Sequence, residues 1–382
     1  MSLWFTANAV TPHLQVRWGL DAGAAGWLTT IVQLGFVGGT AFVAILNLAD
    51  LWPARWLVAG SCLLAAAANA LVVAGDNYAF ALWMRFLTGF FLAGVYPPSM
   101  KMMATWFASN RGLAIGALVG ALTVGKALPF LIRAFRDISP NFVMLSASFG
   151  ALAAGLVIAA VYHDGPHTFE RRPFSWKLVG TVMRHRETRL AVAGYLGHMW
   201  ELYACWSLVA VFFYGFFVQR GASPMAAAAS SGIVGFSVIA VGGLGSVLAG
   251  AWADRLGRER ITIWSMALSG GCCLIIGWLL AAPLWLAVLI SLVWGFAVVA
   301  DSAQFSAVVT EVAPPHAVGT ALTLQTSLGF LLTAFTIWLA VEVSTRFGWG
   351  PAFGMLAIGP AAGIVAMARL KAVRSSPTEV PH

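Results

Sequence analysis

Apolar stretches of about 20 residues recur along the whole chain, and short polar breaks separate them. A helix of this length and character is what the hydrocarbon core of a bilayer requires. The composition agrees, because 60% of the 382 residues are hydrophobic and 9% are charged, whereas a soluble domain carries roughly 25% charge. The sequence therefore predicts an all-α polytopic membrane protein in a lipid bilayer, and it excludes an ordinary soluble enzyme.

The polar breaks divide the chain into about twelve spans. We expect them near residues 2–17, 23–46, 56–75, 79–106, 112–134, 141–162, 189–214, 224–252, 261–281, 284–310, 317–343 and 350–369. The basic, proline-containing segment between the sixth and seventh spans predicts the following organisation: an N-terminal six-helix bundle (1–162), a cytoplasmic basic linker (163–188), a C-terminal six-helix bundle (189–369) and a cytoplasmic tail (370–382). Part of the linker, about 173–186, is expected to lie as an amphipathic helix on the inner leaflet.

Lys and Arg are concentrated in alternate loops and in the C-terminal tail. By the positive-inside rule this places both termini in the cytoplasm of a multi-pass protein. We expect a bacterial inner (plasma) membrane and a monomer. The formal net charge of +8 is explained by cytoplasmic anchoring, and no basic stripe with neighbouring aromatics indicates nucleic-acid binding. The four cysteines lie inside apolar runs without zinc spacing, so no metal site and no cofactor are predicted.

The loops after the second and eighth spans resemble each other. The first reads NLADLWPARW, with Asp50 and Arg55, and the second reads GAWADRLGRER, with Asp254, Arg255 and Arg258. An Asp shortly before an Arg at the same point of each half is weak internal symmetry of the kind that transporter repeats leave.

At these residues the chain resembles the major facilitator superfamily. The stretch from Gly250 to Arg260 is similar to the loop motif of that family, and the segment from Arg85 to Gly94 is similar to its Arg-and-Gly motif in the fourth span. The glycines of the fifth span partly match the antiporter motif. The segment Gly197–Tyr203 resembles bacterial members loosely similar to nitrate/nitrite and cyanate permeases. The resemblance implies two pseudo-symmetric six-helix bundles that rock about a central site lined by spans one, four, seven and ten.

Ionisable side chains are rare inside the expected spans. Those that lie deep within a span are His13, Arg85, Lys126, His198, Glu201 and Asp301. Each costs roughly 2.5–3.5 kcal/mol at the bilayer centre, so each should be paired, face water or serve transport. Glu201 and Asp301 could carry a coupling proton, with His198 three residues from Glu201 on the same helix; the alternative is a structural hydrogen-bonded pair.

The basic residues are candidates for substrate binding. Lys126 needs a counter-charge, which is either a carboxylate of the protein or an anionic substrate. Arg85 could contact the substrate, reach the outer surface, or brace polar backbone of the first span. Further binding candidates are His13, Asn8, Tyr96, Tyr203, Trp206 and Gln304. Tyr96 precedes two prolines that should bend the fourth span. The loop residues Asp254, Arg255, Arg258, Asp50 and Arg55 are expected to act in gating.

The resulting expectation is a secondary active transporter, proton-coupled, that moves a small anionic or zwitterionic solute by alternating access. One alternative is a multidrug or metabolite efflux antiporter. An alternative of another class is a non-transporting membrane receptor or assembly factor, which would need large soluble loops. No HExxH, GxSxG or Walker pattern occurs, so the sequence gives no sign of an enzyme or of an ATP-driven pump.

Overall fold

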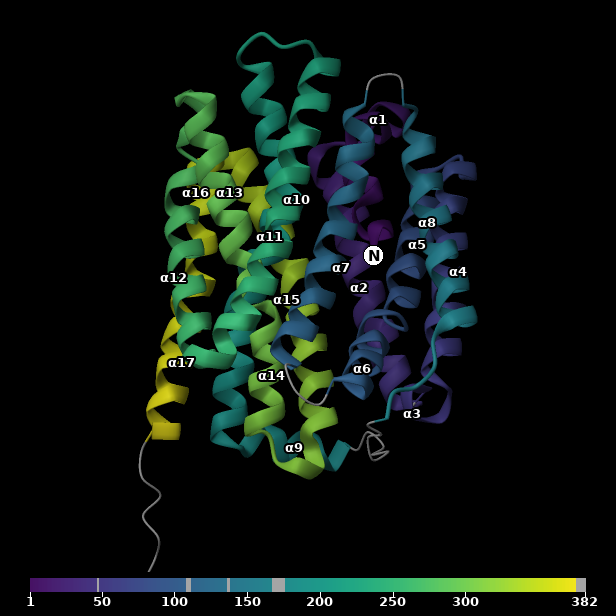
Figure 1. Cartoon of the computed structure of the whole chain (residues 1–382). Coiled ribbons are helices and arrows are strands. Elements are labelled where there is room, and N and C mark those ends of the chain that lie inside the picture. Colours follow the sequence, from purple (N-terminus) through teal and green to yellow (C-terminus); the bar gives the residue numbers. More distant parts are fainter. Residues whose placement is uncertain (47, 108–110, 136–137, 167–175, 376–382) are drawn as a thin grey trace, which may run out of the picture.

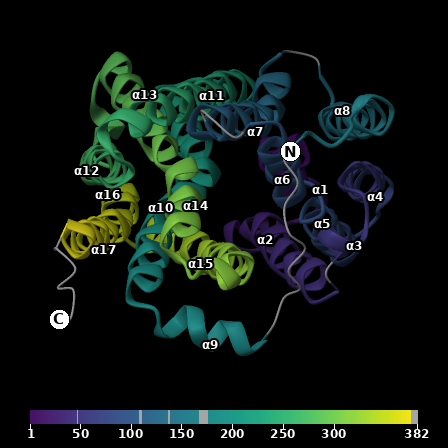
Figure 2. The same cartoon turned by 60° about the horizontal axis from the view of Figure 1, so that its bottom comes forward.

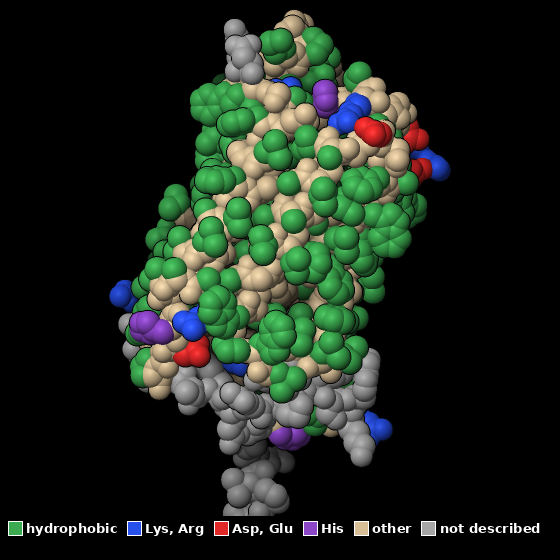
Figure 3. Space-filling view, turned by 90° about the vertical axis from the view of Figure 1, so that its right-hand side faces the viewer, with side chains coloured by type: hydrophobic (Ala, Val, Ile, Leu, Met, Phe, Trp, Pro, Cys, Tyr) green, Lys and Arg blue, Asp and Glu red, His purple; other side chains and the backbone are tan. Residues whose placement is uncertain are grey.

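The computed structural model describes residues 1–46, 48–107, 111–135, 138–166 and 176–375. Within these ranges the chain is helical, without strands, and eleven helical segments are long and apolar enough to cross a membrane. The helices run side by side along one axis (Figure 1). On the face shown in Figure 3 the middle band is covered by hydrophobic side chains, and the charged groups lie near the two ends. The all-α polytopic architecture is therefore confirmed.

The first half of the chain supplies these elements: a 3-10 turn at Ser2–Phe5, α1 (Thr6–Trp18), α2 (Ala22–Ile45), α3 (Leu48–Leu51), α4 (Ala54–Ala74), α5 (Tyr78–Leu92), α6 (Tyr96–Trp106), α7 (Arg111–Ala134) and α8 (Pro140–Val161). Side-chain caps begin three of the long helices, because Asp21, Asn77 and Ser139 each accept a hydrogen bond from a backbone N–H of the first turn.

The second half begins with α9 (Trp176–Arg184) and continues with α10 (Arg186–Val218), α11 (Pro224–Leu256), α12 (Arg258–Ile276), α13 (Leu284–Ala300), α14 (Ser302–Val312), the 3-10 turn η3 (Pro315–Ala317), α15 (Val318–Phe347), α16 (Trp349–Gly354) and α17 (Ile358–Ser375). The helix α9 lies across one end of the molecule (Figure 2) and packs on α10, α15 and η3. It falls within the segment expected to form an amphipathic helix, about 173–186, of which residues 173–175 lie outside the described ranges.

The first expected span is the exception to the pattern of long helices. It consists of the turn Ser2–Phe5 and the 13-residue α1, and it is too short and too polar to rank among the eleven membrane-crossing segments. Leu3, Trp4 and Phe5 are fully buried, and residue 1 lies at mid-height of the bundle in Figure 1. This segment is therefore held inside the bundle, and a cytoplasmic N-terminus stays a prediction.

Two long spans are interrupted. In the fourth span α5 ends at Leu92 and α6 begins at Tyr96, with Pro97 and Pro98 in the first turn of α6, where proline is tolerated because that turn lacks acceptors for its N–H groups. The tenth span breaks at Asp301, between α13 and α14. The prolines predict the first break, and no proline or glycine stands at the second.

The two halves meet along two helix pairs, α7 with α11 and α2 with α15 (Figure 2). The approach of α7 to α11 is close, because a Cβ on Gly116 would lie 2.7 Å from the Ser246 carbonyl oxygen and one on Gly120 would lie 2.9 Å from that of Gly243. Small residues of this kind let membrane helices pack backbone to backbone. The fifth-span glycines thus bring the two halves together.

Candidate functional site

Lys126 of α7 lies at the centre of the molecule, where the two halves meet. Its side chain is 2% exposed, and Nζ donates a hydrogen bond to the hydroxyl of Tyr203 on α10. The ammonium also lies 4.6 Å from the ring centroid of Trp4, 4.5 Å from that of Tyr203 and 4.7 Å from that of Trp206. Among the described residues no carboxylate lies within ion-pair distance, so ring faces and one hydroxyl surround this cation.

These rings belong to a larger group that we call the aromatic cage, which comprises Trp4, Phe5, Phe36, Phe130, Tyr203, Trp206 and Phe330. Neighbouring ring centroids in the cage are 4.3–6.3 Å apart. The first half supplies Trp4, Phe5, Phe36 and Phe130, and the second half supplies the rest. The cage therefore joins the two halves, and Lys126 reaches from the first half onto rings of the second.

Arg85 of α5 is fully buried in the first half, and it is satisfied without a carboxylate. Its guanidinium donates to the backbone carbonyls of Leu3 (2.7 Å), Trp4 and Leu28 (3.3 Å), and to the side-chain oxygens of Thr6 (3.1 Å) and Asn69 (3.0 Å). These contacts agree with one of the three roles considered from sequence, the bracing of polar backbone in the first segment. Arg85 holds the turn that carries Trp4 against α2 and α4.

Glu201 of α10 lies within the second half, away from the cage. One carboxylate oxygen accepts from the Ser269 hydroxyl at 2.8 Å, and the other accepts from the Cys273 thiol at 3.2 Å and from the indole N–H of Trp294. These partners come from α12 and α13. Glu201 and Tyr203 are two residues apart, and residues at that separation point to nearly opposite sides of an α-helix. The structure therefore separates Glu201 from the Lys126 site.

His198 pairs with Asp301 at the break in the tenth span. The imidazole Nδ1 lies 2.8 Å from Asp301 Oδ1, and Nε2 lies 3.0 Å from the Ser302 hydroxyl. Both side chains of the pair are 2% exposed. His198 and Glu201, although three residues apart, contact different helices, so the sequence-based grouping of these two residues is replaced by the grouping of His198 with Asp301.

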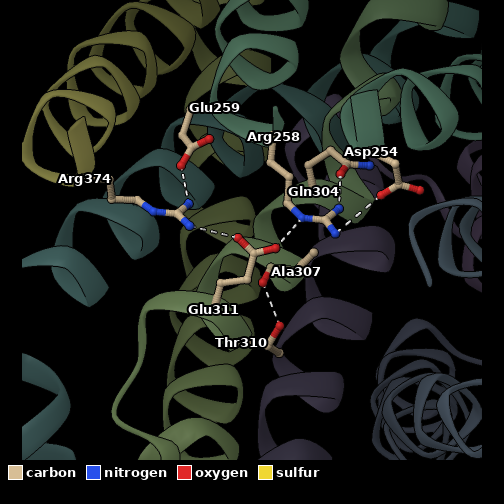
Figure 4. A network of polar contacts seen from close by, with 8 residues as sticks. All are labelled: Asp254, Arg258, Glu259, Gln304, Ala307, Thr310, Glu311 and Arg374. Atoms are coloured by element: carbon tan, nitrogen blue, oxygen red, sulfur yellow. Dashed lines mark hydrogen bonds and ion pairs between the residues drawn. The ribbon is translucent and has the colours of Figure 1, made fainter. Parts of the chain in front are cut away.

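Charged residues at one end of the second half form the network shown in Figure 4. Arg258 contacts Glu311 (2.6 Å), Asp254 (3.5 Å) and the side-chain oxygen of Gln304 (2.8 Å). Arg374 contacts Glu311 from the other side, at 3.3 Å, and also Glu259. The network ties together α11, α12, α14 and α17, all from the second half. Gln304, a substrate candidate from sequence, is placed here and not in the cage.

The remaining candidates are dispersed. Asn8 accepts a hydrogen bond from the Thr29 hydroxyl at 2.8 Å, and His13 is exposed on α1. Tyr96 begins α6 and is not among the rings that form the cage. Arg255 is exposed, and the guanidinium of Arg55 lies over the ring of Trp56 at 4.8 Å.

Asp50 lies in α3, but its side chain is outside what the structure describes. Among the described residues, no group of three or more His, Cys, Asp or Glu side chains is placed to hold a metal ion.

Sequence reasoning missed several members of the site. Trp4, Phe5, Phe36, Phe130 and Phe330 complete the cage, and Asn69 orients Arg85. Such aromatics carry no signal in a chain with 17 Trp and 25 Phe residues. Asn69 could have been noticed as a polar residue within an otherwise apolar span, since such a residue needs a partner in lipid.

Comparisons with known proteins agree with this architecture. Residues 1–242 and 221–382 match the Major Facilitator Superfamily, so the match covers the chain. The chain is similar to the agnestins efflux protein AgnL12 of Paecilomyces divaricatus, with 26% identity over 258 residues, 65% of this chain and 56% of that protein. It is also similar to the putative uncharacterized transporter YgaY of Escherichia coli (strain K12), with 26% identity over 126 residues, 32% of this chain and 31% of that one.

The chain thus spans about half the length of the first relative and about a third of the second. Three observations lead to the same conclusion: the match along the whole sequence, the eleven apolar segments long enough to cross a membrane, and the pairing of the two halves through α7–α11 and α2–α15. The chain belongs to the Major Facilitator Superfamily.

Proposed function

We propose that this protein is a secondary active transporter that moves a small anionic or zwitterionic solute by alternating access. The observation that carries the proposal is Lys126, an ammonium buried between the two halves without a carboxylate in ion-pair distance among the described residues. A charge at this depth is costly unless it is paired or has a function. An anionic solute would supply the missing counter-charge.

The location of Lys126 also suits alternating access. Its hydrogen bond to Tyr203 and its contact with the Trp206 ring join α7 of the first half to α10 of the second. If the halves separate, these contacts are lost and the ammonium becomes available to a solute. The Lys126 ammonium would then bind the solute when the halves are apart and would hold the halves together when no solute is bound.

Proton coupling, as a second part of the proposal, is assigned to His198 and Asp301. The imidazole and carboxylate lie 2.8 Å apart, both buried, at the point where α13 gives way to α14. Protonation changes the charge of such a pair, and a helix break is a place where that change can alter geometry. Glu201 is the weaker candidate, because both of its oxygens already accept hydrogen bonds.

The test of the anion assignment is a thermal-shift screen on the purified protein with acetate, succinate, benzoate, phosphate and sulfate, followed by uptake of each stabilising anion in proteoliposomes. A ligand of the native state raises Tm. We expect Lys126→Gln to reduce kcat/KM about 100-fold, since loss of one partner of a buried charge pair costs about 2–5 kcal/mol. Lys371→Gln on α17 is the matched control. Equal increases in Tm and equal anion uptake in the wild type and Lys126→Gln would reject Lys126 as the anion-binding residue.

Efflux of an apolar aromatic compound is the second candidate. It is favoured by the aromatic cage and by the similarity to a protein named as an efflux protein. The two candidate functions predict different effects of Lys126→Gln, because transport of an uncharged compound would not need the Lys126 ammonium. We further propose that the protein is a monomer of the bacterial plasma membrane with the basic loops and both termini on the cytoplasmic side, as the positive-inside rule predicts.

A further inference from the structure

Resting on the proposed anion transport, we propose a narrower substrate class: an aromatic carboxylate that enters when the two halves separate at the cage, with its ring on the ring faces that pack on one another in this structure and its carboxylate bound by Lys126 and the two indole N–H groups of Trp4 and Trp206. The proposal follows from the hydrogen-bonding balance of the cage, from its aromatic lining and from one unpaired amide one helical turn from Phe36.

The cage has more hydrogen-bond donors than acceptors. The ammonium of Lys126 carries three N–H bonds, and the structure gives it one acceptor, the Tyr203 hydroxyl. The indole Nε1 atoms of Trp4 and Trp206 are buried, and neither has an acceptor among the described residues. A buried donor without a partner is costly. The complementary ligand group is therefore rich in acceptors and negatively charged, and a carboxylate has two such oxygens.

The walls of the cage select a flat ligand body. Lys126 sits against the faces of Trp4, Tyr203 and Trp206, and Phe36 and Phe330 close the cage with centroids 4.3 Å apart. An aromatic ligand can stack on such rings in offset or edge-to-face geometry, which an aliphatic ring of similar size cannot reproduce. A compact inorganic anion has no ring face that could replace the contacts these rings make with one another.

A second polar contact is available at one side of the cage. Gln33 lies one helical turn from Phe36 on α2, is fully buried, and has neither its amide nitrogen nor its amide oxygen paired among the described residues. Residues three apart share a helix face and differ by about 4.5 Å along the axis. An amide can both donate and accept, so it suits a neutral substituent such as a hydroxyl on the ring of the solute.

The first experiment compares four compounds by thermal shift on the purified full chain: benzoate, cyclohexanecarboxylate, acetate and benzyl alcohol. We expect benzoate to bind about three- to tenfold more tightly than cyclohexanecarboxylate, because stacking is lost in the latter. Acetate and benzyl alcohol should bind more weakly than both, because acetate lacks the ring and benzyl alcohol lacks the carboxylate. Benzyl alcohol also controls for partition of an aromatic compound into the detergent.

The second experiment removes single N–H groups while keeping an aromatic ring. Trp206→Phe and Trp4→Phe should each weaken benzoate binding about three- to tenfold, because each deletes one donor to the carboxylate. The matched control is Trp200→Phe on the same helix as Trp206, since the Trp200 indole donates to the Met355 carbonyl at 3.2 Å, outside the cage. Gln33→Met should abolish any preference for 4-hydroxybenzoate over benzoate and leave benzoate binding unchanged.

The outcomes separate this inference from the proposed function. If cyclohexanecarboxylate, acetate or phosphate binds as tightly as benzoate and Lys126→Gln abolishes that binding, anion transport stands and the aromatic class is overturned. If no anion binds the wild type, or if Lys126→Gln binds anions equally well, both proposals fail. If Trp206→Phe and Trp4→Phe bind benzoate like the wild type, the indole N–H groups are not ligands and the proposed site is wrong. A Tm for each ligand-free variant verifies that it is folded.

Discussion

The two halves of the molecule bury charges of opposite sign. Inside the spans of the first half the described buried charges are cations, Arg85 and Lys126, whereas those of the second half are the carboxylates Glu201 and Asp301, beside His198. None of these described charges forms an ion pair across the interface. Under the proposed function the first half would receive the anion and the second the proton, so coupling between them would cross the interface at the aromatic cage.

The buried charges also differ in whether their partners come from the same half or from the other half. Arg85 is held by carbonyl and side-chain oxygens, and Glu201 by a hydroxyl, a thiol and an indole, all from the same half as the charge itself. Lys126 is different, because its hydrogen bond is to Tyr203 of the opposite half. Arg85 and Glu201 therefore stabilise the half in which they lie, whereas the contacts of Lys126 can change when the two halves move relative to each other.

The largest effect is expected for Arg85→Met. The substitution removes the five hydrogen bonds that the buried guanidinium donates, and a hydrogen bond from a charged group contributes about 1.5–3 kcal/mol, so the free energy of unfolding should fall by about 3 kcal/mol or more. The measurement is the Tm of the purified variant in detergent. The anion affinity of the protein that remains folded should fall by no more than the roughly three- to tenfold expected for Trp4→Phe, because Arg85 positions the turn that carries Trp4. A larger loss of anion affinity in a variant of normal stability would place Arg85 in the substrate site.

Glu201→Gln should have the next largest effect. The glutamine keeps one acceptor oxygen for the three donors of Ser269, Cys273 and Trp294, so at least one hydrogen bond to a charged group is lost. We expect a destabilisation of about 2 kcal/mol, read out as a lower Tm. Proton-dependent uptake should persist. Its loss in a variant of normal stability would move the coupling role from Asp301 to Glu201.

Asp301→Asn should alter coupling more than stability. The asparagine oxygen can still accept from the imidazole of His198, so the free energy of unfolding should change by less than about 1 kcal/mol. The fixed neutral side chain no longer exchanges a proton, so the dependence of the anion uptake rate on pH should weaken. Uptake into proteoliposomes at several values of pH tests this expectation, with Glu201→Gln as the comparison. An unchanged pH profile would exclude the pair as the coupling site.

The smallest effect is expected at the network of Figure 4. The Arg258 and Glu311 side chains are 17% and 37% exposed, so their interaction should contribute about 0.2–1 kcal/mol. A double-mutant cycle of Arg258→Gln and Glu311→Gln, read as Tm at low and high salt, measures it. A coupling that salt does not weaken would mean that the network is shielded from water and contributes more than a surface ion pair.

Much of the fold could be predicted, because a run of about 20 apolar residues in a membrane protein indicates a helix that crosses the bilayer. The expected start of the second span at 23 and the observed start of α2 at Ala22 differ by one residue, and the break before Pro97 follows from the missing N–H of proline. The first segment is harder to assign, because its stability comes from contacts such as Arg85 with the Leu3 carbonyl, which lie far apart in the sequence.

The sequence predicted the charged residues of the site and two of the aromatic residues around Lys126, but not the remaining partners. Lys126, Tyr203 and Trp206 were all candidates, and they do come together. Helical geometry alone is enough to separate Glu201 from Tyr203, since residues two apart face nearly opposite directions. The pairing of His198 with Asp301 depends instead on how α10 and the tenth span are placed relative to each other, which a single sequence does not specify.

The glycine contact between α7 and α11 has a mechanical consequence. The two backbones are packed so closely that a Cβ added to Gly116 would lie 2.7 Å from the Ser246 carbonyl oxygen, which leaves little room for the two helices to slide. We therefore expect the α7–α11 contact to act as a pivot between the two halves. A small tilt of one half about this contact would produce a larger opening at either membrane surface. Widening this contact with a methyl group, as in Gly116→Ala, would shift the pivot itself and alter how far each mouth of the carrier can open.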